Sequence, residues 1–189
     1  MRIVRGTVRA WAAVLAIVVA AVVATAAAAP GTTAGAGAAP GAEDTPEPEG
    51  GTVDGFAIGH VPAALAEGAE VEASEVSFTW GGVDFTARTW ERALAGGGFR
   101  VELQVLVMRA ETLAGPEELR AFLAEYHERD AQEWELEEFD HRGSPGFMGA
   151  AEAFWLEDRG VAVEVRDSAD LLGREEVRRT ALGITREEG

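Results

Sequence analysis

The sequence contains no cysteine, no lysine and no asparagine, so all sixteen of its basic residues are arginine. Without cysteine there is no disulfide, no thiolate metal site, no iron–sulfur cluster and no lipid-modified cysteine. Without lysine there is neither a Walker-type phosphate loop nor a Schiff-base enzyme, and without asparagine there is no N-glycosylation acceptor. These absences exclude several classes of enzyme and one kind of membrane attachment.

Positive charge is also scarce. The chain has 33 acidic residues against 16 basic ones, which gives a formal net charge of −17 over 189 residues. Nucleic-acid binding depends on clustered cations that neutralise backbone phosphates, and anionic lipid headgroups attract the same kind of cluster. We therefore expect no nucleic-acid partner, and membrane contact only through the N-terminal segment.

Residues 1–29 have the pattern of an export signal. Arg2, Arg5 and Arg9 precede an uncharged run from Ala10 to Ala29. A basic start, an apolar middle and small residues at the end are typical of a secretory signal peptide. The run also has the length of about 20 residues that a membrane-spanning helix needs. A cleaved signal peptide and an uncleaved N-terminal membrane anchor both remain open. Under either reading the protein is exported, either secreted or anchored by residues 10–29 with its domain outside.

Two further segments follow. Residues 30–51 consist mainly of Gly, Pro, Ala and acids, and such a composition buries too little apolar surface to offset its chain entropy. We expect them to form a disordered linker. Residues 52–189 are long enough for one ordinary extracytoplasmic domain with its own core.

Alternation of apolar and polar residues predicts a meander of strands in the first half of this domain. Val76, Phe78 and Trp80 recur with the period of two that marks a half-buried strand. Gly81-Gly82 supplies a tight hairpin turn, and the alternation continues beyond it. Trp90 falls on the opposite parity, which predicts either a bulge near residues 88–89 or a second buried face.

The rest of the domain alternates strands with two helices. Residues 99–108 form a regular strand, and Leu106 and Met108 on its other face predict a covering helix. Helices are expected from Pro116 to Arg129 and from Arg174 to Leu182. We also expect a strand near Trp134–Phe139, a glycine-rich loop at 143–149 and a hairpin turning at 158–160. The order of elements indicates an α+β fold, an antiparallel β-sheet built from the meander and the C-terminal hairpin with about two packed helices.

Aromatic residues supply the first candidate site. Four tryptophans on expected strands could line a cavity for an apolar ligand, with two large apolar residues of the glycine-rich loop as its lid. The alternative is that these side chains simply form the core. The candidate ligand-binding residues are Trp80, Trp90, Trp134, Trp155, Phe147 and Met148.

Histidines supply the second candidate site. His127, Asp130 and His141 could approach one another across the turn after the helix and bind zinc. Their spacing matches no metal-binding motif, and the alternative is one histidine at the edge of the core and one in a loop. No catalytic constellation is recognised, so no catalytic residue is assigned and no cofactor is expected.

The C-terminal segment from Phe154 onward resembles the closing unit of several exported bacterial domains. In that unit a Trp-bearing hairpin precedes a helix that packs on the sheet. Similar units end domains of unknown function on membrane-anchored anti-sigma factors and envelope lipoproteins, and the chain as a whole is similar to secreted or anchored actinobacterial proteins. The residues that carry the resemblance are Trp155, Val163, Leu172, Glu176, Val177 and Ala181. The resemblance implies a fold rather than a catalytic role, and this chain lacks the lipid-bearing cysteine of the lipoproteins.

These patterns favour an exported, non-catalytic protein-interaction or sensing module whose partner is another envelope protein. A carrier of an apolar small ligand is the first alternative, and a small hydrolase is the second. The sequence leaves the oligomeric state open.

Overall fold

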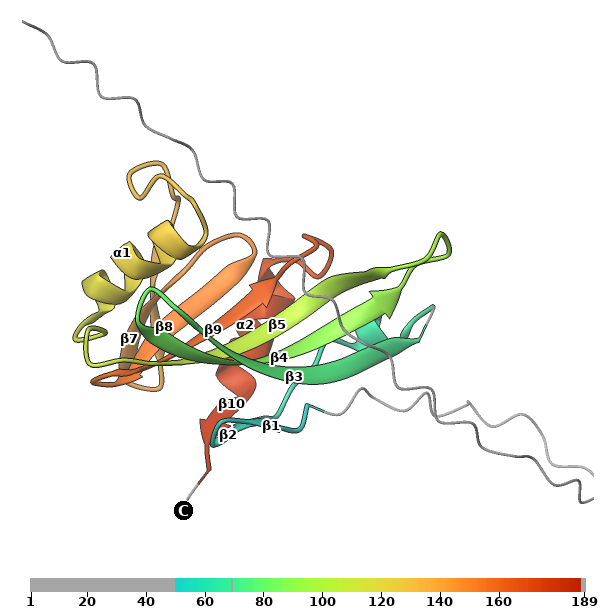
Figure 1. The fold of residues 1–189 in the computed structure, drawn as a ribbon, viewed down its shortest axis with the longest axis horizontal. Coiled ribbons are helices and arrows are strands. Elements are labelled where there is room, and N and C mark those ends of the chain that lie inside the picture. The colour runs from blue at the N-terminus through green and yellow to red at the C-terminus, as the bar shows by residue number, and fades with distance from the viewer. Residues whose placement is uncertain (1–49, 69, 188–189) are drawn as a thin grey trace, which may run out of the picture. The chain divides into compact units, whose positions relative to one another are not determined.

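A computed structural model describes residues 50–68 and 70–187 of the chain. The fold is α+β, as the sequence predicts, and its centre is a seven-stranded antiparallel sheet (Figure 1). The strands in spatial order are β3 (Val71–Trp80), β4 (Val83–Ala93), β5 (Phe99–Arg109), β9 (Val161–Asp167), β8 (Glu152–Asp158), β7 (Ser144–Met148) and β6 (Glu137–His141).

The sheet is two meanders joined in the middle. The first runs inward from β3 at one edge to β5, and the second runs inward from β6 at the other edge to β9. β5 and β9 pair in antiparallel register from Leu103 opposite Asp167 to Arg109 opposite Val161. The first strand of each meander is therefore an edge strand of the sheet.

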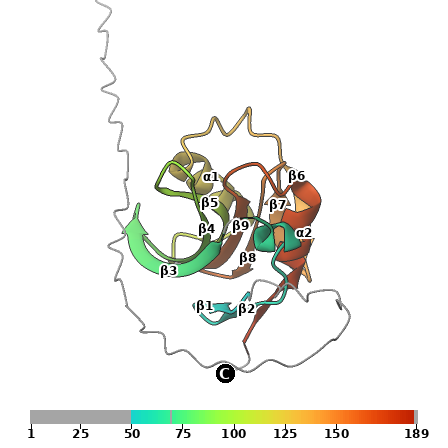
Figure 2. The same ribbon diagram turned by 90° about the vertical axis from the view of Figure 1, so that its right-hand side faces the viewer.

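Two helices cover opposite faces of this sheet. α1 (Pro116–Tyr126) lies on one face, and α2 (Arg174–Gly183) lies on the other (Figure 2). The 3₁₀ helix η1 (Ala63–Ala66) and a small sheet of β1 (Thr52–Val53), β2 (Phe56–Ile58) and β10 (Ile184–Arg186) complete the described part. Within residues 50–68 and 70–187, neither helix has the length and hydrophobicity of a membrane span.

The core beneath α1 confirms the expected covering helix. Leu106 and Met108 of β5 are buried there together with Leu119 and Leu123 of α1. The second core lies beneath α2 and contains Val105 and Val107 from the same strand. Because successive side chains of a strand point to opposite faces, β5 supplies both cores.

The parity change at Trp90 has both of the expected consequences. Phe85 and Ala87 belong to the core beneath α1, whereas Trp90 belongs to the core beneath α2. A register shift between Trp90 and Glu91 follows immediately, slightly later than residues 88–89. The Gly81-Gly82 turn is also confirmed, with φ angles of 58° and 79°.

Ser144–Met148, within the glycine-rich segment at 143–149, form strand β7, so the prediction of a loop there is wrong. β7 pairs with β8 and places Gly146 opposite Trp155. A Cβ atom at Gly146 would lie 2.1 Å from the carbonyl oxygen of Phe154. Glycine is needed there because another backbone approaches closely, a use that looks like loop composition in the sequence. The strand expected from Trp134 likewise begins only at Glu137.

The predictions for the leader and for most of the linker lie outside the described residues. They therefore stay predictions. The first strand of the described part begins at Thr52, and Gly50 and Gly51 precede it without regular secondary structure.

Candidate functional site

A groove of about 620 Å³ lies beside the end of α1, between the segment that follows this helix and the turns at the ends of β7 and β9. Its basic residues are Arg129 and Arg166, and six acids also line it. The walls of this groove come from three separate stretches of the chain, so the groove forms only when the domain folds. The question is whether any of its charged groups is available to a ligand.

The two buried carboxylates of the groove are occupied by neighbouring groups. Glu152 accepts hydrogen bonds from both terminal nitrogens of Arg129, at 3.2 and 3.1 Å, and from the indole N–H of Trp134 at 2.8 Å. Asp167 accepts the backbone N–H groups of residues 171, 172 and 173. Each carboxylate therefore holds a loop against the sheet.

A chain of three ionisable side chains leads from Arg166 at the groove into the core. Arg166 Nη1 donates to His127 Nδ1 at 2.6 Å, and His127 Nε2 lies 2.7 Å from Glu164 Oε1. Because an arginine is always a donor, His127 Nδ1 is the acceptor and Nε2 carries the proton donated to Glu164. Both ring nitrogens are thus engaged, and the imidazole side chain is only 4% exposed. This geometry leaves His127 without a nitrogen for general acid–base work.

Glu164 is the most deeply buried acid of the described part. Its side chain is 0% exposed, and its Oε2 atom has no hydrogen-bond partner among the described residues. Burial, and then the nearby charge of Glu164, raise the pKa of Tyr126. The carboxylate lies among apolar residues of the core beneath α1 rather than on the wall of the groove. A ligand that enters the groove from solvent therefore cannot contact it.

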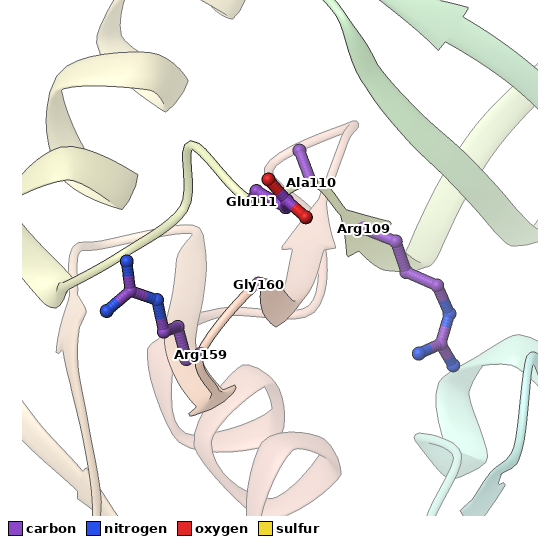
Figure 3. Close-up of a pocket in the computed structure, with 5 residues that line it drawn as sticks. All are labelled: Arg109, Ala110, Glu111, Arg159 and Gly160. Carbon is purple, nitrogen blue, oxygen red and sulfur yellow. The ribbon is translucent and has the colours of Figure 1, made fainter.

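A second hollow, of about 660 Å³, lies between the end of β5 and the β8–β9 turn. Figure 3 shows that its two arginines point away from each other. Arg109 turns toward β1 and β2, where its Nε atom donates to Asp54 at 2.6 Å. Arg159 extends in a different direction, and no set of polar groups converges on one point. This hollow has none of the features of a specific binding site.

The six aromatic and apolar candidates of the sequence analysis do not line one cavity, because the sheet divides them. Trp90, Trp155 and Met148 belong to the core beneath α2. Trp134 and Phe147 belong to the core beneath α1, and Trp80 contacts α1 at the edge of the sheet. Phe147 and Met148 are adjacent residues of β7 that point to opposite faces, so together they form no lid.

The proposed zinc ligands are not brought together, so that prediction is wrong. His127 caps the C-terminus of α1 and bonds Glu164, while Asp130 is exposed in the following turn. His141 lies on the other face, where it stacks on Trp155 with ring centroids 4.1 Å apart. The described residues contain no group of three side chains placed to hold a metal ion.

The edge strand β3 is the candidate that the sequence analysis missed. It pairs with β4 over ten residues without a register shift, and none of its residues is buried. No described strand pairs with its other side (Figure 2). The first strand of a predicted meander can be an edge strand, so β3 was one possible edge. The sequence could not show with which end of the meander the second half of the chain would pair.

Comparisons with protein-family models, with curated proteins and with solved structures gave no match.

Proposed function

We propose that this chain is a non-catalytic protein-interaction module that is exported through its N-terminal segment and binds another envelope protein at the edge strand β3. The observation that carries the proposal is the bare edge itself. A row of unpaired backbone N–H and C=O groups is a template for another strand, and peptide recognition by strand addition uses such edges.

β3 carries the charges of Glu72 and Glu75, which are one device that protects a sheet edge, but it lacks the other devices. Such edges are usually very short, interrupted by proline or a bulge, or covered by a helix or loop. β3 has ten residues, no proline and no bulge, and the described elements leave it uncovered. The opposite edge strand, β6, has five residues, two of which are buried. Retention of a long open edge on an exported domain is readily explained if a partner occupies it.

The state of the buried ionisable groups supports the non-catalytic part of the proposal. His127 uses both ring nitrogens, and the buried carboxylates of Glu152 and Asp167 bind neighbouring loops. A general base or nucleophile must be free to reach a substrate atom. These groups stabilise the fold instead.

Site-specific photo-crosslinking in cells that export the protein tests the proposal. A photoreactive residue replaces Ser77 in β3, and the matched control replaces Glu138, which is also exposed but lies on the β6 edge. We expect one defined envelope protein to be crosslinked from position 77 and not from position 138. Equal labelling from both positions, or none from position 77, would refute a partner at β3.

A further inference from the structure

We infer that the partner binds through an extended basic segment that adds to β3 as an eighth strand, with a cation facing Glu72 and Glu91 and apolar side chains packed against Trp80 and Phe78. This inference rests on the proposed function and deepens it, because it names the chemistry of the partner. Three features of the edge lead to it: the free backbone groups, an unbalanced pair of acids and a strip of half-exposed aromatic rings.

The hairpin turn determines which backbone groups of β3 face outward. Gly81 and Gly82 both have positive φ angles, as in a two-residue type I′ turn, so the flanking Trp80 and Val83 form a hydrogen-bonded pair. Hydrogen-bonded and non-hydrogen-bonded pairs then alternate along the ladder. It follows that the free N–H and C=O groups belong to Ala73, Glu75, Ser77 and Thr79. Four such residues in register can support an added strand of about eight residues.

One pair of facing acids near the start of β3 lacks a cation. Glu72 of β3 lies directly opposite Glu91 of β4, and like charges in that position destabilise a sheet. Among the described ion pairs neither Glu72 nor Glu91 has a partner, whereas Glu75, on the other face of β3, lies opposite Arg88. By contrast, Glu102 in the neighbouring strand is bound by two arginines. A lysine or arginine on the added strand would neutralise the repulsion between Glu72 and Glu91.

The other end of the same face is apolar. Phe78 stacks on Phe85 with ring centroids 4.8 Å apart, and Trp80 makes edge contacts with Phe122 and Tyr126 at 5.4 and 5.2 Å. These contacts fix the inner sides of the rings, while Trp80 remains 36% exposed. Apolar side chains spaced two residues apart on an added strand would cover the outer sides, since side chains of neighbouring strands lie within about 5.5 Å.

Charge complementarity selects this occupant over two others. A second copy of the domain would bring its own Glu72 and Glu75 to the same edge and add a second strongly negative body. Residues 30–49 of this chain carry four acids, and their four prolines lack the N–H groups that a paired strand must donate. A basic segment of another protein can supply both the positive charge and the backbone N–H donors that β3 requires.

A labelled nine-residue peptide tests the inference. It has arginine at the position facing Glu72 and valine at the three positions facing Val76, Phe78 and Trp80, and it is made in both chain directions. Fluorescence anisotropy with the exported protein measures its affinity. We expect binding that weakens with salt. The variant Glu72→Gln/Glu91→Gln should bind about five- to tenfold more weakly, as two exposed charge contacts imply. The control Glu111→Gln/Glu125→Gln, which removes two exposed acids elsewhere, should bind as the unaltered protein does.

Two changes test the strand geometry itself. Ser77→Pro removes one outward N–H group without removing a donor of the β3–β4 ladder, and it should abolish binding while the unfolding midpoint changes little. A peptide N-methylated on the residues that face β3 should not bind. Undiminished binding in either case would overturn strand addition.

The remaining outcomes separate this inference from the proposed function. Equal affinity for a peptide with glutamine in place of arginine would overturn the basic partner, and so would a dimer in sedimentation that Ser77→Pro abolishes. Absence of peptide binding together with a specific crosslink from position 77 would overturn the inference and leave the proposed function standing. Absence of both results would overturn both.

Discussion

Replacement of Glu102 by glutamine should destabilise the domain strongly, because this acid neutralises two arginines from inside the fold. Its side chain is 4% exposed and lies at the bulge between β4 and β5. Arg92 donates to its two oxygens at 2.8 and 2.9 Å, and Arg100 donates to Oε1 as well. Arg92 also donates to the backbone carbonyls of Ala64 and Glu67, so this cluster ties η1 to the sheet.

The size of the effect follows from what the substitution leaves behind. Removal of one partner from a buried ion pair costs about 3–5 kcal/mol. Arg92 keeps its two carbonyl acceptors and the introduced amide keeps one oxygen acceptor, so we expect the free energy of unfolding of Glu102→Gln to fall by about 2 kcal/mol. In a domain of this size that corresponds to a decrease of about 8 °C in the unfolding midpoint. The exposed pair of Glu137 and Arg174 provides the control, since Glu137→Gln should change stability by less than about 1 kcal/mol.

Dependence on pH gives a second, independent readout. The hydrogen bond from Arg92 lowers the pKa of Glu102, and the bond from Arg100 lowers it further. A carboxylate with a lowered folded-state pKa contributes stability above its unfolded-state pKa, near 4.5, and loses that contribution as the pH falls through the folded-state pKa. The difference between the unaltered protein and Glu102→Gln should therefore be constant from pH 7 to 5 and shrink below 4.5. Urea denaturation at pH 7, 5 and 3.5 measures this difference. A difference that is absent at pH 7 or unchanged at pH 3.5 would contradict a stabilising role for the Glu102 carboxylate.

Two further predictions concern His141 and Gly146. Burial lowers the pKa of His141, so below about pH 6.5 the unfolded chain takes up a proton that the folded protein does not, and the free energy of unfolding should fall as the pH decreases. His141→Gln should reduce this pH dependence in urea denaturation between pH 7 and 5.5. An unchanged pH dependence in the variant would contradict the prediction. Gly146→Ala should destabilise by about 3 kcal/mol because its Cβ would meet the backbone of β8, whereas Gly96→Ala, which meets nothing within 4 Å, should leave the denaturation midpoint unchanged or slightly raised. Similar midpoints for the two alanine variants would contradict this account of β7.

The hydrogen-bond partners in the candidate site could not be predicted from the sequence. His127 and Glu164 are 37 residues apart and Trp134 and Glu152 are 18 apart, yet each pair forms a buried hydrogen bond. Nothing in the local pattern marks these partners, because the same sequence is rich in acids throughout. Which end of the first meander would remain an exposed edge was equally hidden, since the alternation along β3 does not show where the second half of the chain pairs.

Elements that depend on neighbouring residues could be predicted from the amino-acid sequence. Alternation along β3 and β5, the two positive-φ glycines between β3 and β4, and the apolar stripe of α1 each express a local conformational preference, and the structure agrees with them. The strand order, the role of Gly146 and the partners of the buried charges become visible only in the folded chain. In the folded chain β9 pairs with β5, which covers that edge and leaves β3 open. That choice depends on hydrogen bonds and buried area between segments more than 50 residues apart, which no local periodicity encodes.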